Sequence, residues 1–533
     1  MLAGRLIRGH APTLRLLARV PLAVLLGLAG FFIWGGVTRG HNWGDDFAQY
    51  IMQAKSIVEG RPQAFIDANR FTVEQSSMPD TPVAYPWGFP LLLAPLYAAF
   101  GLELVALKAV NLVCFLLFIA VLWVSFHKHH SPLGRVAGVS LFAVNPRMLR
   151  ANDDILSDIP FLLLSTVCVV LIGFVIVDRR RLISTTWDQL LLGAALASAF
   201  LVRSNGILLL VTLVISQAVG AILRASSHRA AGAATPRPPR TGYAALRSDF
   251  ALLPYVSFAL ITLAWTTILP DGGSSYVDHL RRVRLADILR HVHYYVDLPS
   301  AFFDSVPHHQ IVYGATIPLA LTGASRRMRS DYHILVYITL TVGLYLIWPD
   351  TEGLRFLFPI LPFYVSFVLG SLDHPGERFT STAKARWRKA IWIVPVVIVL
   401  VYFVRASTRN VVDNLSRNRA SLSGPFVNTS QEMLAFITAH TPVDSTIIFF
   451  KPRAMRLLTG RRSILITRVD QLGRGDHLCY YRDGSSDLQL TRSDLDRVVA
   501  TGNFQLIYAN EDFEVYRLTG SRREGQGVAD GEK

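Results

Sequence analysis

Charged residues are scarce in this sequence. They make up 17% of its 533 residues, whereas soluble globular domains carry about 25%. Cysteine is scarcer still: there are three, of which Cys114 and Cys168 lie in apolar runs and Cys479 lies alone near the C-terminal end. The composition argues against a soluble chain, and the cysteines indicate neither a disulfide framework nor a metal site. We therefore expect no resident metal or other cofactor, although the sequence does not decide whether the protein needs a divalent metal ion.

Apolar residues are abundant by contrast. They make up 51% of the sequence, and runs near the ~20 residues that a helix needs to cross a bilayer recur as far as residue 404. The formal net charge is +15, but the basic residues form short clusters between apolar runs. That is the pattern of cytoplasmic loops rather than of a nucleic-acid-binding surface. The sequence predicts a polytopic α-helical membrane protein with no nucleic-acid partner.

About eleven segments are predicted to cross the membrane, starting from a cytoplasmic N-terminus. They are 21–37, 103–126, 133–144, 159–177, 190–202, 206–223, 250–269, 310–322, 334–348, 356–372 and 391–404. The apolar run 89–100 is too short to cross, and prolines interrupt regular helix at its start. We expect this run to be an interfacial or re-entrant segment.

The sequence changes character after residue 404. Stretches of β-branched and aromatic residues predict strands at 445–450, 462–466, 504–508 and 514–518, and helical spacing predicts helices at 430–440 and 493–501. We expect a transmembrane domain at 1–404 and a small extracytoplasmic α/β domain at 405–520. Residues 521–533, which are rich in Gly, Arg and Glu, are expected to form a disordered tail.

Two adjacent carboxylates, Asp45 and Asp46, follow the first apolar segment, where a helix would emerge into water. Asp46 shares a helical face with Tyr50 and Ala54, whereas Asp45 is turned about 100° away. This spacing favours Asp46 as a catalytic base whose carboxylate Tyr50 orients through its hydroxyl, with Asp45 in a supporting role. The alternative is an ordinary helix end, because the N-terminus of a helix stabilises acidic side chains.

Further charged residues lie near the expected outer membrane surface: Asp153, Asp154 and Asp158 in one loop, Arg203 between two spans, and Arg355 at the start of another. A charge at membrane depth costs roughly 2.5–3.5 kcal/mol on insertion scales, so such residues tend to be paired or functional. A carboxylate base together with arginines suits a reaction in which a hydroxyl or amine attacks and a phosphate leaves. The alternative is that these charges only neutralise one another within the bundle.

Four motifs carry a family resemblance. They are Asp46-x-x-x-Tyr50-x-x-x-Ala54 followed by Glu59-Gly60, Tyr85-Pro86-Trp87-Gly88-Phe89-Pro90-Leu91, Leu156-Ser157-Asp158-Ile159-Pro160, and Arg355-Phe356-Leu357-Phe358-Pro359-Ile360-Leu361-Pro362. Their order over residues 15–405 resembles the GT-C superfamily of polytopic glycosyltransferases, in particular the bacterial members similar to protein O-mannosyltransferases and lipid A aminoarabinose transferase. The sequence departs from these relatives at Asp45-Asp46, where they often have Asp-Glu, and at Tyr85-Pro86-Trp87, where the aminoarabinose enzymes have Lys-Pro-Pro.

The resemblance implies an inverting glycosyltransferase of the bacterial plasma (inner) membrane. Such an enzyme moves a sugar from a polyprenyl-phosphate donor to a glycan, lipid or protein acceptor on the outer face. The expected site residues are Asp46 and Asp45 for catalysis, Arg355 and Arg203 for the donor phosphate, and Tyr50, Tyr85, Trp87, Asp154 and Asp158 for substrate. A polytopic transporter or lipid flippase is the alternative, although the sequence shows none of the internal repeats that many transporters have.

The predicted topology can be tested directly. A reporter that is active only outside the cytoplasm, fused after residue 533, is expected to give a signal, because the basic clusters place the inner loops on the opposite side from the C-terminal domain. A silent reporter on a chain that is expressed and inserted would contradict this topology.

Overall fold

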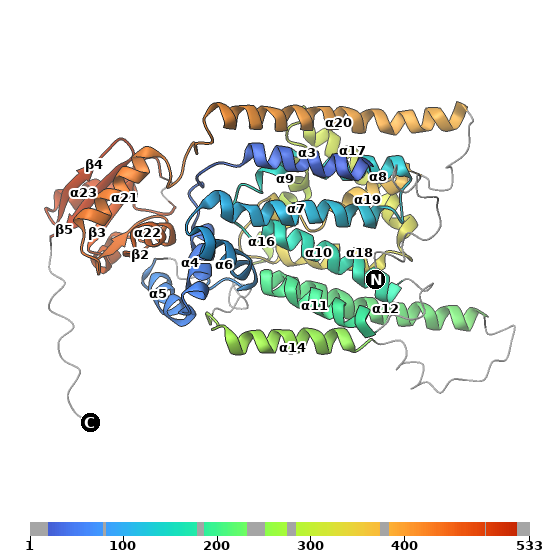
Figure 1. Cartoon of the computed structure of the whole chain (residues 1–533), viewed down its shortest axis with the longest axis horizontal. Helices are drawn as coiled ribbons and strands as arrows, with labels where there is room; N and C mark the ends of the chain where they lie inside the picture. Colours follow the sequence, from blue (N-terminus) through green and yellow to red (C-terminus); the bar gives the residue numbers. More distant parts are fainter. Residues whose placement is uncertain are drawn as a thin grey trace, which may run out of the picture.

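The computed structural model describes residues 20–77, 81–177, 186–231, 251–273, 284–373, 383–484 and 487–519. The expected disordered tail, residues 521–533, lies outside these ranges. Figure 1 shows a bundle of long helices that run side by side, with the C-terminal domain at one end of the bundle.

Each segment predicted to cross the membrane coincides with a helix. These helices are α3 (Val20–Gly36), α7 (Leu104–Phe126), α8 (Pro132–Ala143), α10 (Asp158–Ile172), α11 (Thr186–Val202), α12 (Ile207–Ala231), α14 (Leu253–Ile268), α17 (His309–Arg327), α18 (Tyr332–Leu346), α19 (Leu361–Leu372) and α20 (Ala383–Ser416). Within the described residues, four stretches are long and apolar enough to cross a bilayer: 104–126, 158–177, 204–223 and 392–416. The predicted helical architecture is confirmed, and the number of crossings stays a prediction.

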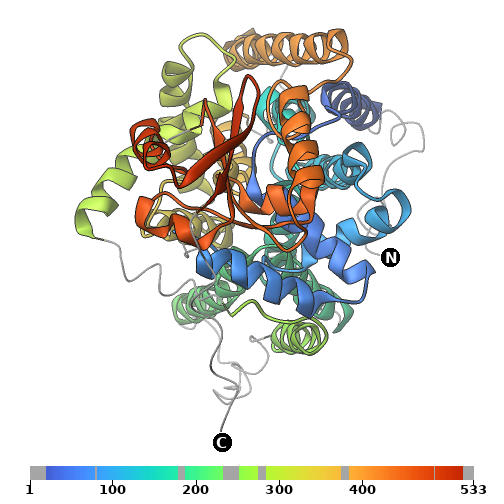
Figure 2. The ribbon, with the colours of Figure 1, turned by 90° about the vertical axis from the view of Figure 1, so that its left-hand side faces the viewer.

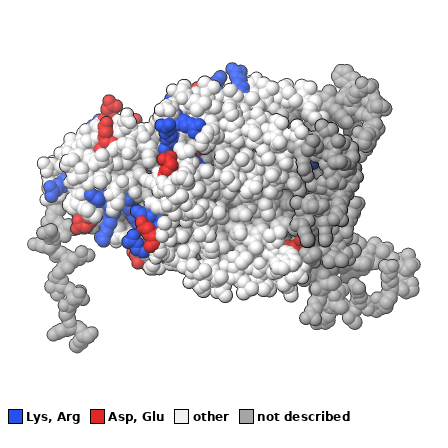
Figure 3. All heavy atoms as spheres, in the orientation of Figure 1, with Lys and Arg blue, Asp and Glu red and all other residues white. Residues whose placement is uncertain are grey.

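The outer surface of the bundle is apolar as well as its interior. On α7, for example, Val113, Leu117 and Val124 are each about half exposed. A helix that is apolar on all sides is suited either to a protein core or to lipid. Figure 3 shows a broad band of the bundle almost free of Lys, Arg, Asp and Glu, while charged residues gather at the end with the C-terminal domain.

Two differences from the predicted bounds bear on the site and on the domain boundary. The span expected from residue 356 begins as the 3-10 turn η4 (Leu354–Leu357), and α19 starts only at Leu361. The prolines at 359 and 362 favour such a break, because proline is tolerated best in the first turn of a helix and removes a backbone hydrogen bond further inside. In contrast, α20 continues to Ser416, past the expected domain boundary at 404.

Helices from the first long loop cover one end of the bundle. They are α4 (Asp45–Val58), α5 (Pro62–Gln75) and α6 (Gly88–Phe100). With 13 residues, α6 is about as short as the predicted spans α8 and α19, which have 12 residues each, so its length does not set it apart from them. It packs against α4, which fits the expectation that this segment does not cross. The short helix α9 (Pro146–Arg150) lies at the same end of the bundle (Figure 1).

The C-terminal domain is a five-stranded sheet with strand order β2-β1-β3-β5-β4. Its elements are α21 (Asn428–His440), β1 (Thr446–Ile448), α22 (Pro452–Thr459), β2 (Arg462–Ile464), the 3-10 segment η6 (Val469–Arg474), β3 (His477–Tyr481), α23 (Arg492–Ala500), β4 (Phe504–Ala509) and β5 (Phe513–Leu518). The strands β1, β2 and β3 are parallel, whereas β5 pairs antiparallel with β3 and β4.

Alternating residues give this sheet two apolar faces. Ile448 and Leu478 join one buried cluster with Leu495 of α23. Ile447 and Cys479 join the other, which includes residues of α21. Four of the strands, β1, β2, β4 and β5, match strands predicted from the sequence, whereas β3 and α22 were not predicted. The β3 stretch His477–Tyr481 has no β-branched residue, and α22 is an eight-residue helix, so both patterns are weak.

A buried lysine fixes the chain where it leaves α3. The Lys108 ammonium on α7 donates hydrogen bonds to the Gly40 carbonyl at 2.6 Å and to the Asp153 carboxylate at 2.6 Å. The same carboxylate accepts the Thr38 backbone N–H at 2.7 Å. This contact ties together α7, the exit of α3 and the loop before α10, and it sets where α4 begins.

We expect Lys108→Met to destabilise the protein by about 3 kcal/mol, the lower end of the range for a broken buried pair, because the partly exposed Asp153 carboxylate would lose its buried cation. The measurement is the thermal unfolding temperature of the purified protein in detergent. Lys55→Met is the matched control, since Lys55 on α4 is 46% exposed and lies 3.8 Å from Glu59 at the surface. Equal stability of the two variants would contradict the anchoring role of Lys108.

Candidate active site

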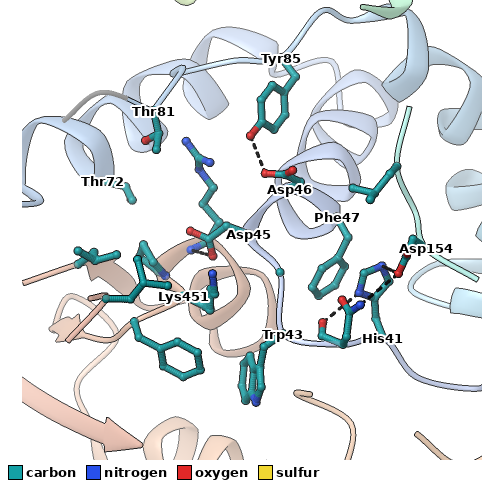
Figure 4. Close-up of a pocket in the computed structure, with 18 of the residues that line it drawn as sticks. His41, Trp43, Asp45, Asp46, Phe47, Thr72, Thr81, Tyr85, Asp154 and Lys451 are labelled. Atoms are coloured by element: carbon teal, nitrogen blue, oxygen red, sulfur yellow. Dashed lines mark hydrogen bonds and ion pairs between the residues drawn. The ribbon is translucent and has the colours of Figure 1, made fainter. Parts of the chain in front are cut away.

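A cavity of about 530 Å³ lies between α4, the chain around Arg355 and the C-terminal domain. Its lining includes the acids Asp45, Asp46 and Asp154, the bases Arg355, Lys451 and Arg453, and the aromatic residues Trp43, Phe47, Tyr85 and Phe450. Figure 4 shows Asp45, Asp46 and Tyr85 from the first loop in the same close-up as Lys451, which precedes α22. The structure thus brings the predicted first-loop acids to an open, charged cavity.

Asp46 lies in the first turn of α4 and is 38% exposed. One carboxylate oxygen, Oδ1, accepts a hydrogen bond of 2.6 Å from the Tyr85 hydroxyl, and the two side chains point toward one another in Figure 4. Burial and the neighbouring Asp46 raise the pKa of Tyr85 well above its usual value, so this hydroxyl stays protonated and donates. The other oxygen, Oδ2, lies 3.7 Å from Nη2 of Arg355.

The residue that orients Asp46 is therefore Tyr85, and the prediction that Tyr50 does so is wrong. Tyr50 does lie on the same face of α4, but its ring packs between Tyr85 and Phe89. Its hydroxyl bonds Ser157 Oγ at 2.9 Å. Tyr50 is buried, and it supports the site by fixing the ring of Tyr85 and the start of α10.

Arg355 joins two carboxylates from distant parts of the chain. Its guanidinium lies 3.7 Å from Asp46 and 3.5 Å from Asp158, and it is 37% exposed. Asp158, at the start of α10, is buried and also pairs closely with Arg203. The ring of Phe356 lies against both guanidinium groups, 4.4 Å from Arg203 and 4.9 Å from Arg355. Four of the predicted charged residues therefore meet in one cluster: Asp46, Asp158, Arg203 and Arg355.

Asp45 faces the C-terminal domain. Its Oδ1 accepts the backbone N–H of Arg453 at 3.2 Å and of Ala454 at 3.4 Å, at the N-terminus of α22. A carboxylate is stabilised there by the unpaired amides and by the helix dipole. Burial raises the pKa of Asp45, and the charges of Arg453 and Lys451 oppose that shift. Asp45 thus docks α22 onto α4, beside Asp46.

The two acids before α10 have different surroundings. Asp153 belongs to the Lys108 anchor, whereas Asp154 lines the cavity and accepts a hydrogen bond of 3.2 Å from Asn42. Burial, together with Asp153 and Asp158, raises the pKa of Asp154 to about 6.

A second cavity of about 770 Å³ lies between α3, α9 and α20, and it shares Asn42, Asp154 and Arg355 with the first.

Trp87 is away from this cavity. Its side chain is buried, its Nε1 donates to the Pro270 carbonyl at 2.9 Å, and its ring packs on Phe65. It joins the first loop to the chain that follows α14. Among the residues predicted to bind substrate, Tyr85 and Asp154 line the first cavity. Asp158 does not line it, but pairs with Arg355, which does.

The C-terminal domain contributes side chains to the cavity that the sequence did not predict. Lys451 and Arg453 line the cavity, and Arg453 is buried, with Nη2 donating to the Pro82 carbonyl at 2.9 Å. The available signal was Lys451-Pro452-Arg453 directly after a strand, since proline is favoured in the first turn of a helix. Within the ranges that the structure describes, no group of three or more His, Cys, Asp or Glu side chains is placed to hold a metal ion.

Neither a protein-family model nor a curated protein matches the sequence. Solved structures do resemble the fold. ArnT, a lipid A aminoarabinose transferase, from Cupriavidus metallidurans bound to undecaprenyl phosphate matches with a TM-score of 0.56 at 12% identity, over 93% of this chain and 98% of that one. Its apo structure matches with a TM-score of 0.57 at 12% identity, over 93% of this chain and 97% of that one.

An oligosaccharyltransferase from Archaeoglobus fulgidus, tethered to an acceptor peptide containing an NVT sequon, matches with a TM-score of 0.52 at 9% identity, over 86% of this chain and 69% of that one. These proteins are GT-C glycosyltransferases. The chain has the GT-C fold. The resemblance predicted from the sequence is therefore confirmed at the level of fold, and the GT-C bundle carries the Asp46–Arg355 cluster at the end that the C-terminal domain covers.

Proposed function

We propose that this protein is a membrane glycosyltransferase that moves a sugar from a polyprenyl-phosphate donor to a hydroxyl or amine acceptor, with inversion at the transferred carbon. The observation that carries the proposal is Asp46: a carboxylate open to a cavity, held by the Tyr85 hydroxyl and facing Arg355. A base and a phosphate-binding cation on one cavity wall suit displacement of a phosphate. The GT-C fold supports the same reaction class.

In the proposed mechanism Asp46 removes the proton of the acceptor as the acceptor attacks. A bond forms between the acceptor oxygen or nitrogen and the sugar carbon, while the bond from that carbon to the phosphate oxygen breaks. The phosphate leaves with the bonding electrons. Tyr85 donates to Oδ1 of Asp46, which fixes the carboxylate and leaves Oδ2 to take the proton.

Arg355 is the proposed holder of the departing phosphate. Its guanidinium is partly exposed and lines both cavities, and it offers paired donors that stay charged at any working pH. In the structure its charge is balanced by Asp46 and Asp158. A bound phosphate would draw Arg355 away from Asp46 and free the base. Arg203 does not line the cavity, but it adds positive charge next to the site and holds Asp158 in place through an ion pair.

The two cavities give each substrate its own approach. The second cavity has apolar side chains from the bundle, among them Phe32, Leu149 and Phe358, and would accommodate the first part of a polyprenyl chain. The first cavity lies beneath the C-terminal domain, and its lining includes the charged side chains Asp45, Asp46 and Lys451, which suit a polar acceptor. They meet at Asn42, Asp154 and Arg355, where transfer would occur.

The proposal includes a location. Eleven helices would cross the bacterial plasma (inner) membrane, with the N-terminus in the cytoplasm and the domain after α20 outside. The apolar bundle surface and the C-terminal domain at one end support this arrangement. The donor would then be a lipid-linked sugar on the outer leaflet, and the acceptor a glycan, lipid or protein.

We expect Asp46→Asn to lower the rate of sugar transfer by about 10²–10⁴-fold, the range for a lost general base, while donor binding persists. The measurement is transfer of labelled sugar from a polyprenyl-phosphate donor by purified protein. Asp45→Asn is the matched control, because an amide oxygen still accepts the α22 amides, and a clearly smaller loss is expected. A larger loss in Asp45→Asn would identify Asp45 as the base.

For Arg355, substitution by alanine should raise the KM for the lipid donor, while the protein still folds because Asp158 keeps Arg203 as its partner. Arg355→Lys should restore donor use only in part, since an ammonium cannot reproduce the paired donors of a guanidinium. Arg468→Ala serves as the control, because Arg468 pairs with Asp470 at the surface of the C-terminal domain. Unchanged donor use in Arg355→Ala protein would remove Arg355 from the phosphate site.

A further inference from the structure

Helix α16 (Leu285–Asp297) carries an apolar stripe that no described part of the protein covers. Its members are Leu285, Leu289, Val292 and Val296, which are 73%, 66%, 40% and 57% exposed. Their spacing of four, three and four residues places them on one narrow face of a helix. Four large apolar side chains in one line are a surface that favours an apolar partner.

A second face of α16 holds the helix on the protein. His291 and Tyr295 are buried there. His291 Nδ1 bonds the Leu346 carbonyl at the end of α18, at 3.1 Å, and the Tyr295 hydroxyl accepts the Glu352 backbone N–H at 2.8 Å. The third face is polar and includes Arg290, which is 69% exposed and pairs with Asp287. The apolar stripe therefore lies between a protein-facing side and a water-facing side.

The direction of α16 differs from that of the bundle. Figure 2 looks along the bundle, so that α3, α14 and α20 are seen nearly end-on, whereas α16, the yellow-green helix at the left edge, runs across the view. Its contacts with Leu346 and Glu352 place it at the end of the bundle where Arg355 lies. A helix in this position lies along a membrane surface rather than through the membrane.

We propose that α16 is an interfacial helix whose apolar stripe is covered by a lipid surface, at the boundary between acyl chains and headgroups. An amphipathic helix parallel to the membrane buries its apolar face about 5–10 Å into this boundary and keeps its polar face in water. The three faces of α16 and its direction across the bundle match that placement. The occupant is lipid, and not a second copy of the chain or another protein.

This contact would position part of the active site. Tyr295 on α16 holds the backbone of Glu352, three residues before Arg355. The membrane surface would thus fix the position, along the membrane normal, of the loop that carries Arg355, the proposed phosphate-binding residue. The inference about α16 itself does not depend on the proposed reaction.

The test uses fluorescent labels on the full chain in phosphatidylcholine liposomes, after Cys114, Cys168 and Cys479 have been replaced by alanine. One protein carries Leu289→Cys on the apolar stripe and the other carries Arg290→Cys on the polar face. Headgroup-level nitroxide lipids should quench the Leu289→Cys label more strongly than aqueous iodide does, and iodide should be the stronger quencher for the Arg290→Cys label. Val292→Cys is a second stripe position if Leu289→Cys folds poorly.

Iodide quenching of the stripe label equal to that at Arg290→Cys would overturn the proposal, because the stripe would then face water. Protection of the stripe label from both quenchers would also overturn it and would indicate a protein partner. Disulfide-linked dimers of Leu289→Cys protein would identify a second copy as the occupant. None of these measurements uses sugar transfer, so they can fail or succeed independently of the proposed function.

Discussion

The site is organised around the charge on Arg355. This residue lies at a bundle end, and it is balanced by Asp46 from the first loop and Asp158 from α10. A charge at the edge of an apolar bundle is costly unless it is paired, so the three segments are held together by the cost of separating them. In the proposed mechanism, the phosphate of the substrate replaces Asp46 as the partner of Arg355 and leaves the Asp46 carboxylate to act as the base.

The C-terminal domain takes part in the same balance. Asp45 caps α22 while its neighbour Asp46 faces the cavity, so the docking of the domain and the orientation of the Asp46 carboxylate depend on one helix end. Lys451 and Arg453 then bring positive charge to the cavity from the domain. The domain is therefore part of the cavity wall, and its loss would change the electrostatics of the site as well as its shape.

Much of the fold could be predicted because a bilayer imposes long apolar segments, and each predicted crossing matches a helix. The meeting of Asp46, Asp158 and Arg355 could be predicted because all three stand at the ends of apolar segments that the basic clusters predict to lie on one side of the membrane. The hydrogen-bond partner of Asp46 could not be predicted, because Tyr50 has the right helical spacing, yet the Tyr85 hydroxyl donates the hydrogen bond. The contact of Asp45 with Arg453 spans 408 positions, and no local pattern encodes it.

The central claim is that the cavity network serves a polyprenyl-phosphate-linked sugar. The most direct measurement is to extract the lipid that stays bound to the protein after purification in mild detergent and to identify its headgroup by mass spectrometry. The account predicts enrichment of a polyprenyl phosphate, free or carrying a sugar, over its share in the parent membrane. Bulk phospholipids alone, in the proportions of that membrane, would contradict it.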